Sequence, residues 1–231
     1  MRFGLSRLPL LSVLLVALQA AACSSDGGGG PTTGEVVLIG DSMLAWNRGE
    51  GGAIGHVIAA ETGLNVADRS ISGTRMLDGD DAIPGQLVAN SSGKWRWLVM
   101  DGGGNDVNDT CACGDCGAVM DQLLSADGSK GAFVDLLDGK ATLFDKAIVV
   151  GYPTPAANAQ HGFDRCHEEL KVLRQRWVKL ASLRANVWFV NGADAFGPSQ
   201  TSMYDPDGVH PSIAGSEALG KLVSGTISAN P

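Results

Sequence analysis

From about residue 35 onward, short apolar runs alternate with segments in which apolar residues recur every three or four positions. The runs have the length and β-branched character of strands that are covered on both faces. They lie at residues 36–39, 64–68, 95–100, 146–150 and 187–190. The segments with helical spacing lie at residues 52–62, 118–125, 132–137, 165–184 and 213–224. This alternation predicts a parallel sheet with helices on both faces.

The longest predicted helix, residues 165–184, has one apolar face. The side chains on this face are Leu170, Leu173, Trp177, Leu180 and Leu183. We expect them to belong to the core, and we expect Asp164 to cap the helix.

The elements together predict an α/β fold, a three-layer sandwich in which a mainly parallel five-stranded sheet lies between two layers of helices. In such sheets the functional site lies at the carboxyl ends of the strands, so the residues that follow each strand are candidates for chemistry. Because the sequence shows no repeat and no second linker, we expect residues 35–231 to form a single domain.

The first 22 residues have the pattern of an export signal. Arg2 and Arg7 precede an apolar stretch, residues 8–22, that is too short to cross a bilayer as a helix. Small residues end this stretch. We therefore predict a signal peptide over residues 1–22.

The segment from Leu18 to Cys23 resembles a bacterial lipoprotein cleavage box, although alanine stands three residues before the cysteine, where leucine is preferred. The resemblance implies an exported protein that is anchored in a membrane through a lipidated Cys23 and faces the periplasm or the cell surface. Ordinary signal cleavage nearby is the alternative. Residues 23–34 include four consecutive glycines and are expected to act as a flexible tether.

The charge of the chain excludes one class of partner. The full sequence has a formal net charge of -8, and removing Arg2 and Arg7 with the signal leaves about -10. A chain this acidic is a poor ligand for nucleic acid, which is itself strongly negative.

A candidate nucleophile follows the first predicted strand. Gly40 allows a tight turn after residues 36–39, and Ser42 then stands at the start of a helix, where unpaired backbone N–H groups favour negative charge. A serine needs a base at neutral pH, and Asp207-Gly-Val-His210 near the other end of the chain offers one.

Two further positions suit the stabilisation of an oxyanion. The strand at residues 95–100 leads into a glycine-rich turn that ends in Asn105, whose side-chain amide is a hydrogen-bond donor. The strand-like segment that begins at residue 64 ends at Gly73, where a backbone N–H can approach a substrate closely.

These residues resemble the conserved blocks of the SGNH, or GDSL-type, hydrolase family. The blocks appear in family order over residues 35–225 as Gly40-Asp41-Ser42, Gly73, Gly103-Gly104-Asn105-Asp106 and Asp207-Gly-Val-His210. The chain departs from the family at Met43, where the motif has leucine. The resemblance implies the flavodoxin-like SGNH fold and a serine ester hydrolase.

The resemblance also assigns roles. Ser42 is the expected nucleophile and His210 its base, with Asp207 orienting the imidazole. Asp205 is also acidic and nearby, but only Asp207 has the family spacing to His210. The oxyanion is expected to be met by the backbone N–H groups of Ser42 and Gly73 and by the Asn105 amide.

We expect a small-molecule or glycan ester as substrate, and neither a metal nor a cofactor. Two alternatives stay open: an acyltransferase that passes the acyl group to a sugar hydroxyl with the same residues, and a noncatalytic envelope-binding lipoprotein that keeps the fold. The sequence leaves the acyl group and the oligomeric state open.

Besides Cys23, the chain has four cysteines, Cys111, Cys113, Cys116 and Cys166. In an exported protein two disulfides are favoured over a zinc site. A bridge between Cys111 and Cys113 would be strained, so at least one bridge is expected to reach Cys166 and to join two loops beside the site.

Several aromatic residues and histidines have no assigned role in this scheme. Trp46, four residues after Ser42, is expected to be core rather than a wall of the acyl site. His56 is expected to be a packed or surface residue. His161 and His167 flank Cys166 and are candidates for the rim of the substrate site.

Overall fold

The structure is a computed structural model that describes residues 35–78, 82–90 and 93–231. The predicted signal peptide, the candidate lipidation site Cys23 and most of the predicted tether lie outside the described residues. No helix of the described residues is long and apolar enough to cross a membrane.

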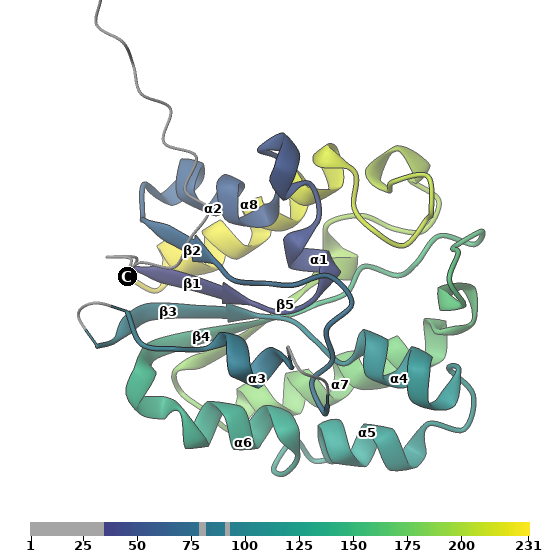
Figure 1. The fold of residues 1–231 in the computed structure, drawn as a ribbon, viewed down its shortest axis with the longest axis horizontal. Helices are drawn as coiled ribbons and strands as arrows, with labels where there is room; N and C mark the ends of the chain where they lie inside the picture. Colours follow the sequence, from purple (N-terminus) through teal and green to yellow (C-terminus); the bar gives the residue numbers. More distant parts are fainter. Residues whose placement is uncertain (1–34, 79–81, 91–92) are drawn as a thin grey trace, which may run out of the picture. The chain divides into compact units, whose positions relative to one another are not determined.

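The centre of the domain is a five-stranded sheet in which every neighbouring pair is parallel (Figure 1). Its strands are β1 (Val36–Ile39), β2 (Val66–Asp68), β3 (Trp95–Met100), β4 (Phe144–Gly151) and β5 (Val187–Asn191). Their spatial order is β2-β1-β3-β4-β5. The predicted five-stranded parallel sheet is thus confirmed, strand for strand.

Helices cover both faces of the sheet (Figure 1). One face is covered by α2 (Ile54–Thr62) and α8 (Ile213–Ala229). The other is covered by α3 (Ile83–Gln86), α5 (Gly117–Leu123), α6 (Ala132–Gly139) and α7 (His167–Ser182). Two helices start at the carboxyl edge of the sheet, α1 (Ser42–Ala45) and α4 (Gly104–Cys111). The remaining elements are 3₁₀ turns: η1 (Arg48–Glu50), η2 (Ala141–Leu143), η3 (Phe163–Arg165), η4 (Gly192–Asp194) and η5 (Thr201–Met203).

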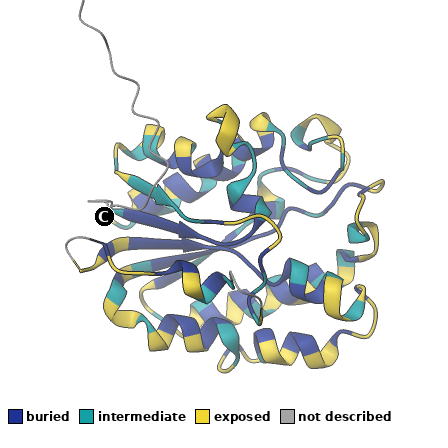
Figure 2. Ribbon diagram, viewed as in Figure 1, coloured by how far each residue is buried: buried dark blue, intermediate teal, exposed yellow. Residues whose placement is uncertain are grey.

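The core lies where the apolar runs predict it. All of β1 is buried, as is the end of β3 from Trp97 to Met100, because helices cover these strands on both sides (Figure 2). In the helical layer formed by α2 and α8, the two helices pack closely on each other. A Cβ at Gly220 in α8 would lie only 2.5 Å from the Cβ of Val57 in α2. The absence of a side chain at Gly220 permits this approach.

The structure corrects three sequence-based expectations. Asp164 does not cap the long helix, because the chain first makes the separate turn η3 and α7 begins only at His167. Leu183 does not belong to the core and is 57% exposed, because it lies just past the end of α7. Asn105 lies in the first turn of α4 rather than in a flexible turn.

The strand order decides where a site can form. The chain moves outward from β1 to β2 and then crosses back to β3 on the other side of β1. In open α/β sheets the crevice between two such strands, at their carboxyl ends, is the usual site for ligands. Ser42 follows β1 and Asn105 follows β3, so both predicted site residues lie at this crevice.

Candidate active site

The turn after β1 presents Ser42 in a fixed position. Asp41 is the N-cap of α1, and its side chain accepts a hydrogen bond from the backbone N–H of Met43 at 2.9 Å. Ser42 is therefore the first residue of the helix, as the sequence predicts. Gly40 is required here, because a Cβ at this position would lie 1.7 Å from Oδ1 of Asp101, the residue that follows β3.

A continuous chain of hydrogen bonds joins Ser42 to two residues from the other end of the sequence. Oγ of Ser42 lies 2.7 Å from Nε2 of His210, and Nδ1 of His210 lies 2.5 Å from Oδ2 of Asp207. An ionised carboxylate can only accept, so the proton of a neutral imidazole belongs on Nδ1 and leaves Nε2 free to accept from Ser42.

Asp207 is held in its ionised form. Burial favours its neutral form, but the hydrogen bond with the His210 side chain and those from the backbone N–H groups of Val209 and His210, at 2.9 and 3.0 Å, lower the pKa of Asp207 below its ordinary value. The carboxylate thus lies ready to orient the imidazole and to balance a positive charge on it.

Asn105 reaches the same place from β3. Its Nδ2 donates one hydrogen bond to the carbonyl of Thr74 at 2.9 Å, which leaves the second N–H of the amide available. Asn105, Ser42 and His210 line a common cavity of about 20 Å³.

Gly73, the third predicted oxyanion residue, does not line this cavity. It has a φ of +80°, which suits glycine, and its neighbours Ile71 and Thr74 both donate to the carbonyl of Gly40, at 2.9 and 3.0 Å. Asp106 accepts hydrogen bonds from the backbone N–H groups of Met76 and Leu77. The segment that contains Gly73 is thus attached both to the turn after β1 and to the start of α4.

A comparison with known protein families identifies the family of the chain. The GDSL-like lipase/acylhydrolase family matches residues 38–218, which include the end of β1, strands β2 to β5 and all of the predicted catalytic and oxyanion residues. The chain belongs to this family. No curated protein matches it.

Solved structures of other proteins share the fold. Est24, a carbohydrate acetylesterase from Sinorhizobium meliloti, is 20% identical with a TM-score of 0.56 over 84% of this chain and 98% of its own. A carbohydrate acetylesterase family member from the same organism is 17% identical with a TM-score of 0.59 over 84% and 97%. The aryl esterase of M. smegmatis is 19% identical with a TM-score of 0.56 over 84% and 98%. At these identities the likeness concerns the fold.

Beneath Ser42 of this GDSL-like domain lies a buried polar network that the sequence did not reveal. The hydroxyl of Tyr152 donates to Oδ2 of Asp41 at 2.6 Å and accepts from the backbone N–H of Gly104 at 3.1 Å. Oδ1 of Asp101 accepts from the backbone N–H of Asp41 at 2.8 Å. Tyr152 therefore connects the turn that presents Ser42 with the start of the helix that presents Asn105.

The two carboxyl groups of this network, Asp41 and Asp101, differ in how far their surroundings raise the pKa. Burial raises the pKa of Asp41, while the hydrogen bonds from Tyr152 and Met43 oppose the rise. Burial and then the neighbouring charge of Asp41 raise the pKa of Asp101 well above its ordinary value. Of the two carboxyls, Asp101 is the one whose pKa burial and the neighbouring charge raise further. The only sequence signal for Asp101 and Tyr152 is their position directly after β3 and β4.

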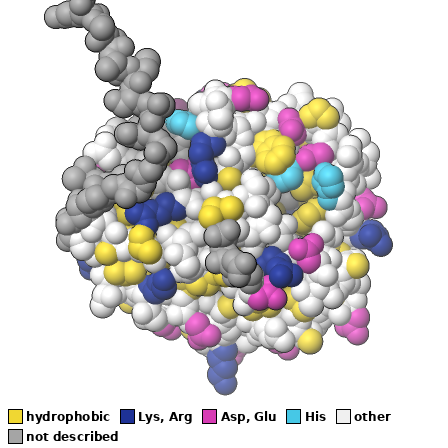
Figure 3. Space-filling model, in the orientation of Figure 1, with side chains coloured by type: hydrophobic (Ala, Val, Ile, Leu, Met, Phe, Trp, Pro, Cys, Tyr) yellow, Lys and Arg dark blue, Asp and Glu magenta, His cyan; other side chains and the backbone are white. Residues whose placement is uncertain are grey.

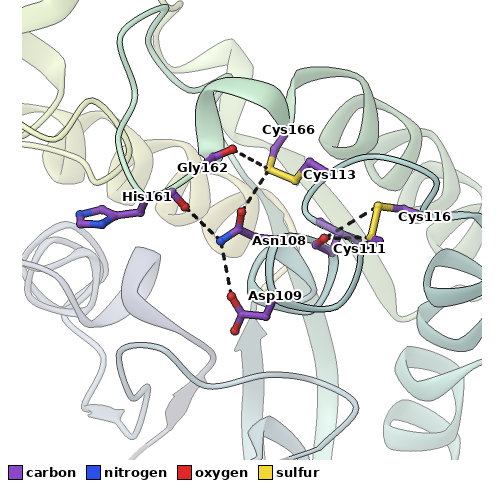
Figure 4. Close-up of a disulfide and its surroundings, with 9 residues drawn as sticks. Asn108, Asp109, Cys111, Cys113, Cys116, His161, Gly162 and Cys166 are labelled. Carbon is purple, nitrogen blue, oxygen red and sulfur yellow. Dashed lines mark hydrogen bonds between the residues drawn. A yellow bond between two sulfur atoms is a disulfide. The ribbon is translucent and has the colours of Figure 1, made fainter.

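The four cysteines form two disulfides at the rim (Figure 4). Cys111 pairs with Cys116, and Cys113 pairs with Cys166, which is the predicted bridge to Cys166. The second bridge joins the end of α4 to the start of α7, beside Phe163 in the wall of the cavity. Asn108 adds a hydrogen bond from its Nδ2 to the carbonyl of His161 at 3.1 Å (Figure 4).

The remaining candidates fall into two groups. His56 and His161 are exposed, and Nε2 of His167 is buried without a partner, so none of the three lines the cavity. Trp46, expected in the core, instead lies flat against the ring of His210 and is only partly buried.

Within the described residues, no three His, Cys, Asp or Glu side chains are grouped to hold a metal ion.

Proposed function

We propose that this GDSL-like domain is a serine hydrolase of short-chain carboxylic esters. The observation that supports the proposal most directly is the uninterrupted chain from Asp207 through His210 to Ser42. This arrangement is the one in which a serine hydroxyl gains a base and the base gains an orienting carboxylate.

In the proposed reaction, Oγ of Ser42 attacks the ester carbonyl carbon while its proton passes to Nε2 of His210. The carbonyl oxygen becomes an oxyanion, which accepts hydrogen bonds from the backbone N–H groups of Ser42 and Gly73 and from the free N–H of Asn105. His210 then gives the proton to the leaving alcohol, and the acyl group stays on Ser42. Water then attacks the acyl carbon while His210 takes its proton, the bond between that carbon and Oγ of Ser42 breaks, and His210 returns the proton to Oγ, so the acid and free Ser42 are the products.

The size of the cavity supports a short acyl group. A volume of about 20 Å³ is room for roughly one water molecule, and a methyl group is of similar size. Apolar side chains from several elements line the cavity: Met43, Pro153, Pro155, Phe163, Leu170 and Val209. The methyl of an acetyl group fits this space, whereas a long acyl chain would extend beyond it.

The test compares p-nitrophenyl esters of increasing chain length. We expect kcat/KM to fall at least tenfold from acetate to octanoate, and Phe163→Ala to reduce this difference by widening the cavity. A preference for octanoate in the unmodified protein contradicts the short-chain assignment.

Matched variants test the serine mechanism. Ser42→Ala and His210→Ala are each expected to remove nearly all turnover, and the double variant should be little worse than either, because the residues act as a unit. Asp207→Asn should be severe and Asp205→Asn mild. Near-normal turnover by Ser42→Ala, or no labelling of Ser42 by a fluorophosphonate, refutes the hydrolase assignment.

We also propose that the protein is exported and anchored through Cys23, on the sequence pattern alone. The native protein should then partition into detergent, and Cys23→Ala should become soluble or stay unprocessed. A mature terminus elsewhere, found unmodified by mass spectrometry, contradicts the anchor.

A further inference from the structure

The ring of Trp46 is stacked on the imidazole of His210. The two ring centroids are 3.7 Å apart and the ring planes differ by only 6°. Trp46 lies one turn after Ser42, and its backbone N–H donates to the carbonyl of Ser42 at 2.8 Å. The nucleophile and the ring that covers its base are therefore parts of the same short helical turn.

Asp205 holds this indole in place. Its Oδ2 accepts a hydrogen bond from Nε1 of Trp46 at 3.1 Å. The backbone N–H of Asp205 donates to the carbonyl of His210 at 2.8 Å. Asp205 thus binds the indole through its side chain and the base through its main chain.

The residue after Trp46 strengthens the same connection. Asn47 has a left-handed backbone with a φ of +61°, and its Nδ2 donates to the carbonyl of Pro211 at 2.9 Å and to Oγ of Ser216 at 3.0 Å. The segment after α1 is therefore fixed to the loop that carries His210. On the face seen in Figure 3, hydrophobic, histidine and acidic side chains lie close together.

The stack restrains a tilt of the His210 ring that its two side-chain hydrogen bonds restrain only weakly. Those bonds lie in the plane of the ring, at Nδ1 and Nε2, and oppose tilting about the line between these atoms only weakly. A parallel indole at van der Waals distance blocks that tilt from one side. The negative face of an indole also attracts a cation, and the imidazole becomes a cation when it takes the proton of Ser42.

We infer that Trp46, held by Asp205, is a positioning residue for His210 and stabilises the imidazolium that forms during ester cleavage. The inference rests on the proposed hydrolase function. It assigns a role to the acidic neighbour of Asp207: Asp205 acts on the base through Trp46, not by replacing Asp207. A rival role for Trp46, a wall that binds the substrate in its ground state, makes a different kinetic prediction.

Two substitutions of Trp46 separate these roles: Trp46→Phe keeps an aromatic face, Trp46→Leu keeps only apolar bulk, and both lose the indole N–H. We expect Trp46→Leu to lower kcat for p-nitrophenyl acetate about 10-fold with KM changed less than about twofold, within the range expected when a cation–π contact is removed. Trp46→Phe should recover most of this loss. Equal kcat values for the Phe and Leu variants, or a change confined to KM, overturn the inference.

Two substitutions of Asp205 test its part in the inference. Asp205→Ala should lower kcat by part of the amount seen with Trp46→Leu, and Asp205→Asn, which keeps an acceptor oxygen, by less. The double variant of Trp46→Leu and Asp205→Ala should be no slower than Trp46→Leu alone, because both act through one contact. Independent, multiplying losses overturn the role of Asp205, and the Asp205 and Phe variants decide the question if Trp46→Leu does not fold.

A spectroscopic measurement does not depend on turnover. In protein with labelled histidine, the ring protons of His210 should be shifted upfield by the indole, and the shift should vanish in Trp46→Leu and persist in part in Trp46→Phe. Unmodified protein with no esterase activity refutes the proposed function and with it the catalytic role. Active protein in which Trp46→Leu leaves kcat and the His210 shift unchanged refutes the inference alone.

Discussion

Replacing Tyr152 by phenylalanine removes one oxygen atom from the buried network below Ser42. The ring keeps its volume and its packing against Trp177, with centroids 5.9 Å apart. Two partners lose their hydrogen bonds, however: Oδ2 of Asp41 and the backbone N–H of Gly104. The residue Asp41 is only 2% exposed. Neither group gains access to water in exchange.

The cost follows from these two contacts. A hydrogen bond to a charged group contributes about 1.5–3 kcal/mol, and a buried polar group left without a partner costs about 1–3 kcal/mol. Because the two effects overlap, we expect Tyr152→Phe to lower the free energy of unfolding by about 2–4 kcal/mol. For a domain of this size that corresponds to a fall in Tm of roughly 5–15 °C.

The loss of unfolding free energy in Tyr152→Phe should depend on pH in a defined direction. The folded-state pKa of Asp41 is raised by burial, and the Tyr152 hydrogen bond opposes the rise, so removing the hydroxyl raises this pKa further. A carboxyl whose pKa is higher in the folded state costs stability when the pH is above that pKa, and the cost fades as the pH falls toward 3.8, the ordinary value. Tyr152→Phe should therefore be most harmful at alkaline pH and less harmful in mild acid.

Urea unfolding of both proteins at pH 8, 6.5 and 5 measures this difference. Tyr204→Phe is the matched control, because the buried Tyr204 donates its hydroxyl to a neutral acceptor, the carbonyl of Thr154, at 2.5 Å. The control should lose stability by an amount that is nearly the same at each pH. A Tyr152→Phe loss that is constant with pH, or that grows in acid, refutes the assignment of Asp41 as its charged partner.

Three other predictions concern single contacts. Asn105→Ala should lower kcat by roughly 100-fold or more with little change in KM, since a donor to the oxyanion acts only in the transition state, and a pure KM effect in steady-state kinetics contradicts that role. Gly40→Ala should abolish folding or stable expression, because its Cβ would overlap Oδ1 of Asp101, and a normally stable variant by thermal melting would show that the approach is not as close as 1.7 Å. Reducing the bridge between Cys113 and Cys166 should lower activity at temperatures where far-UV circular dichroism is unchanged, because the bridge fixes the rim of the site and not the sheet. Free thiols at these two residues, found by peptide mapping of unreduced protein, contradict the pairing.

Much of the fold follows from local signals in the sequence. The strand at Trp95–Met100 is found within its predicted limits, because its apolar run is bounded by polar and glycine residues. The helix at Ile54–Thr62 ends where Gly63 adopts the left-handed conformation that stops a helix. The errors lie at boundaries, as at Asp164 and Leu183, where a turn or the end of a helix moves a residue out of the periodic pattern.

The candidate site divides in the same way. The sequence by itself determined which groups have the chemistry, because Ser42, Asn105, Asp207 and His210 stand after predicted strands or in spaced motifs, and because local periodicity fixes the strands and helices that hold them. Only the tertiary structure decided the contacts made by Trp46, Asp205 and Tyr152 and the pairing of Cys113 with Cys166. Ser42 and His210 are 168 positions apart, and Tyr152 and Asp41 are 111 apart. Contacts over such separations depend on the order of strands in the sheet and on the path of the loops, which no local pattern of hydrophobic and polar residues encodes.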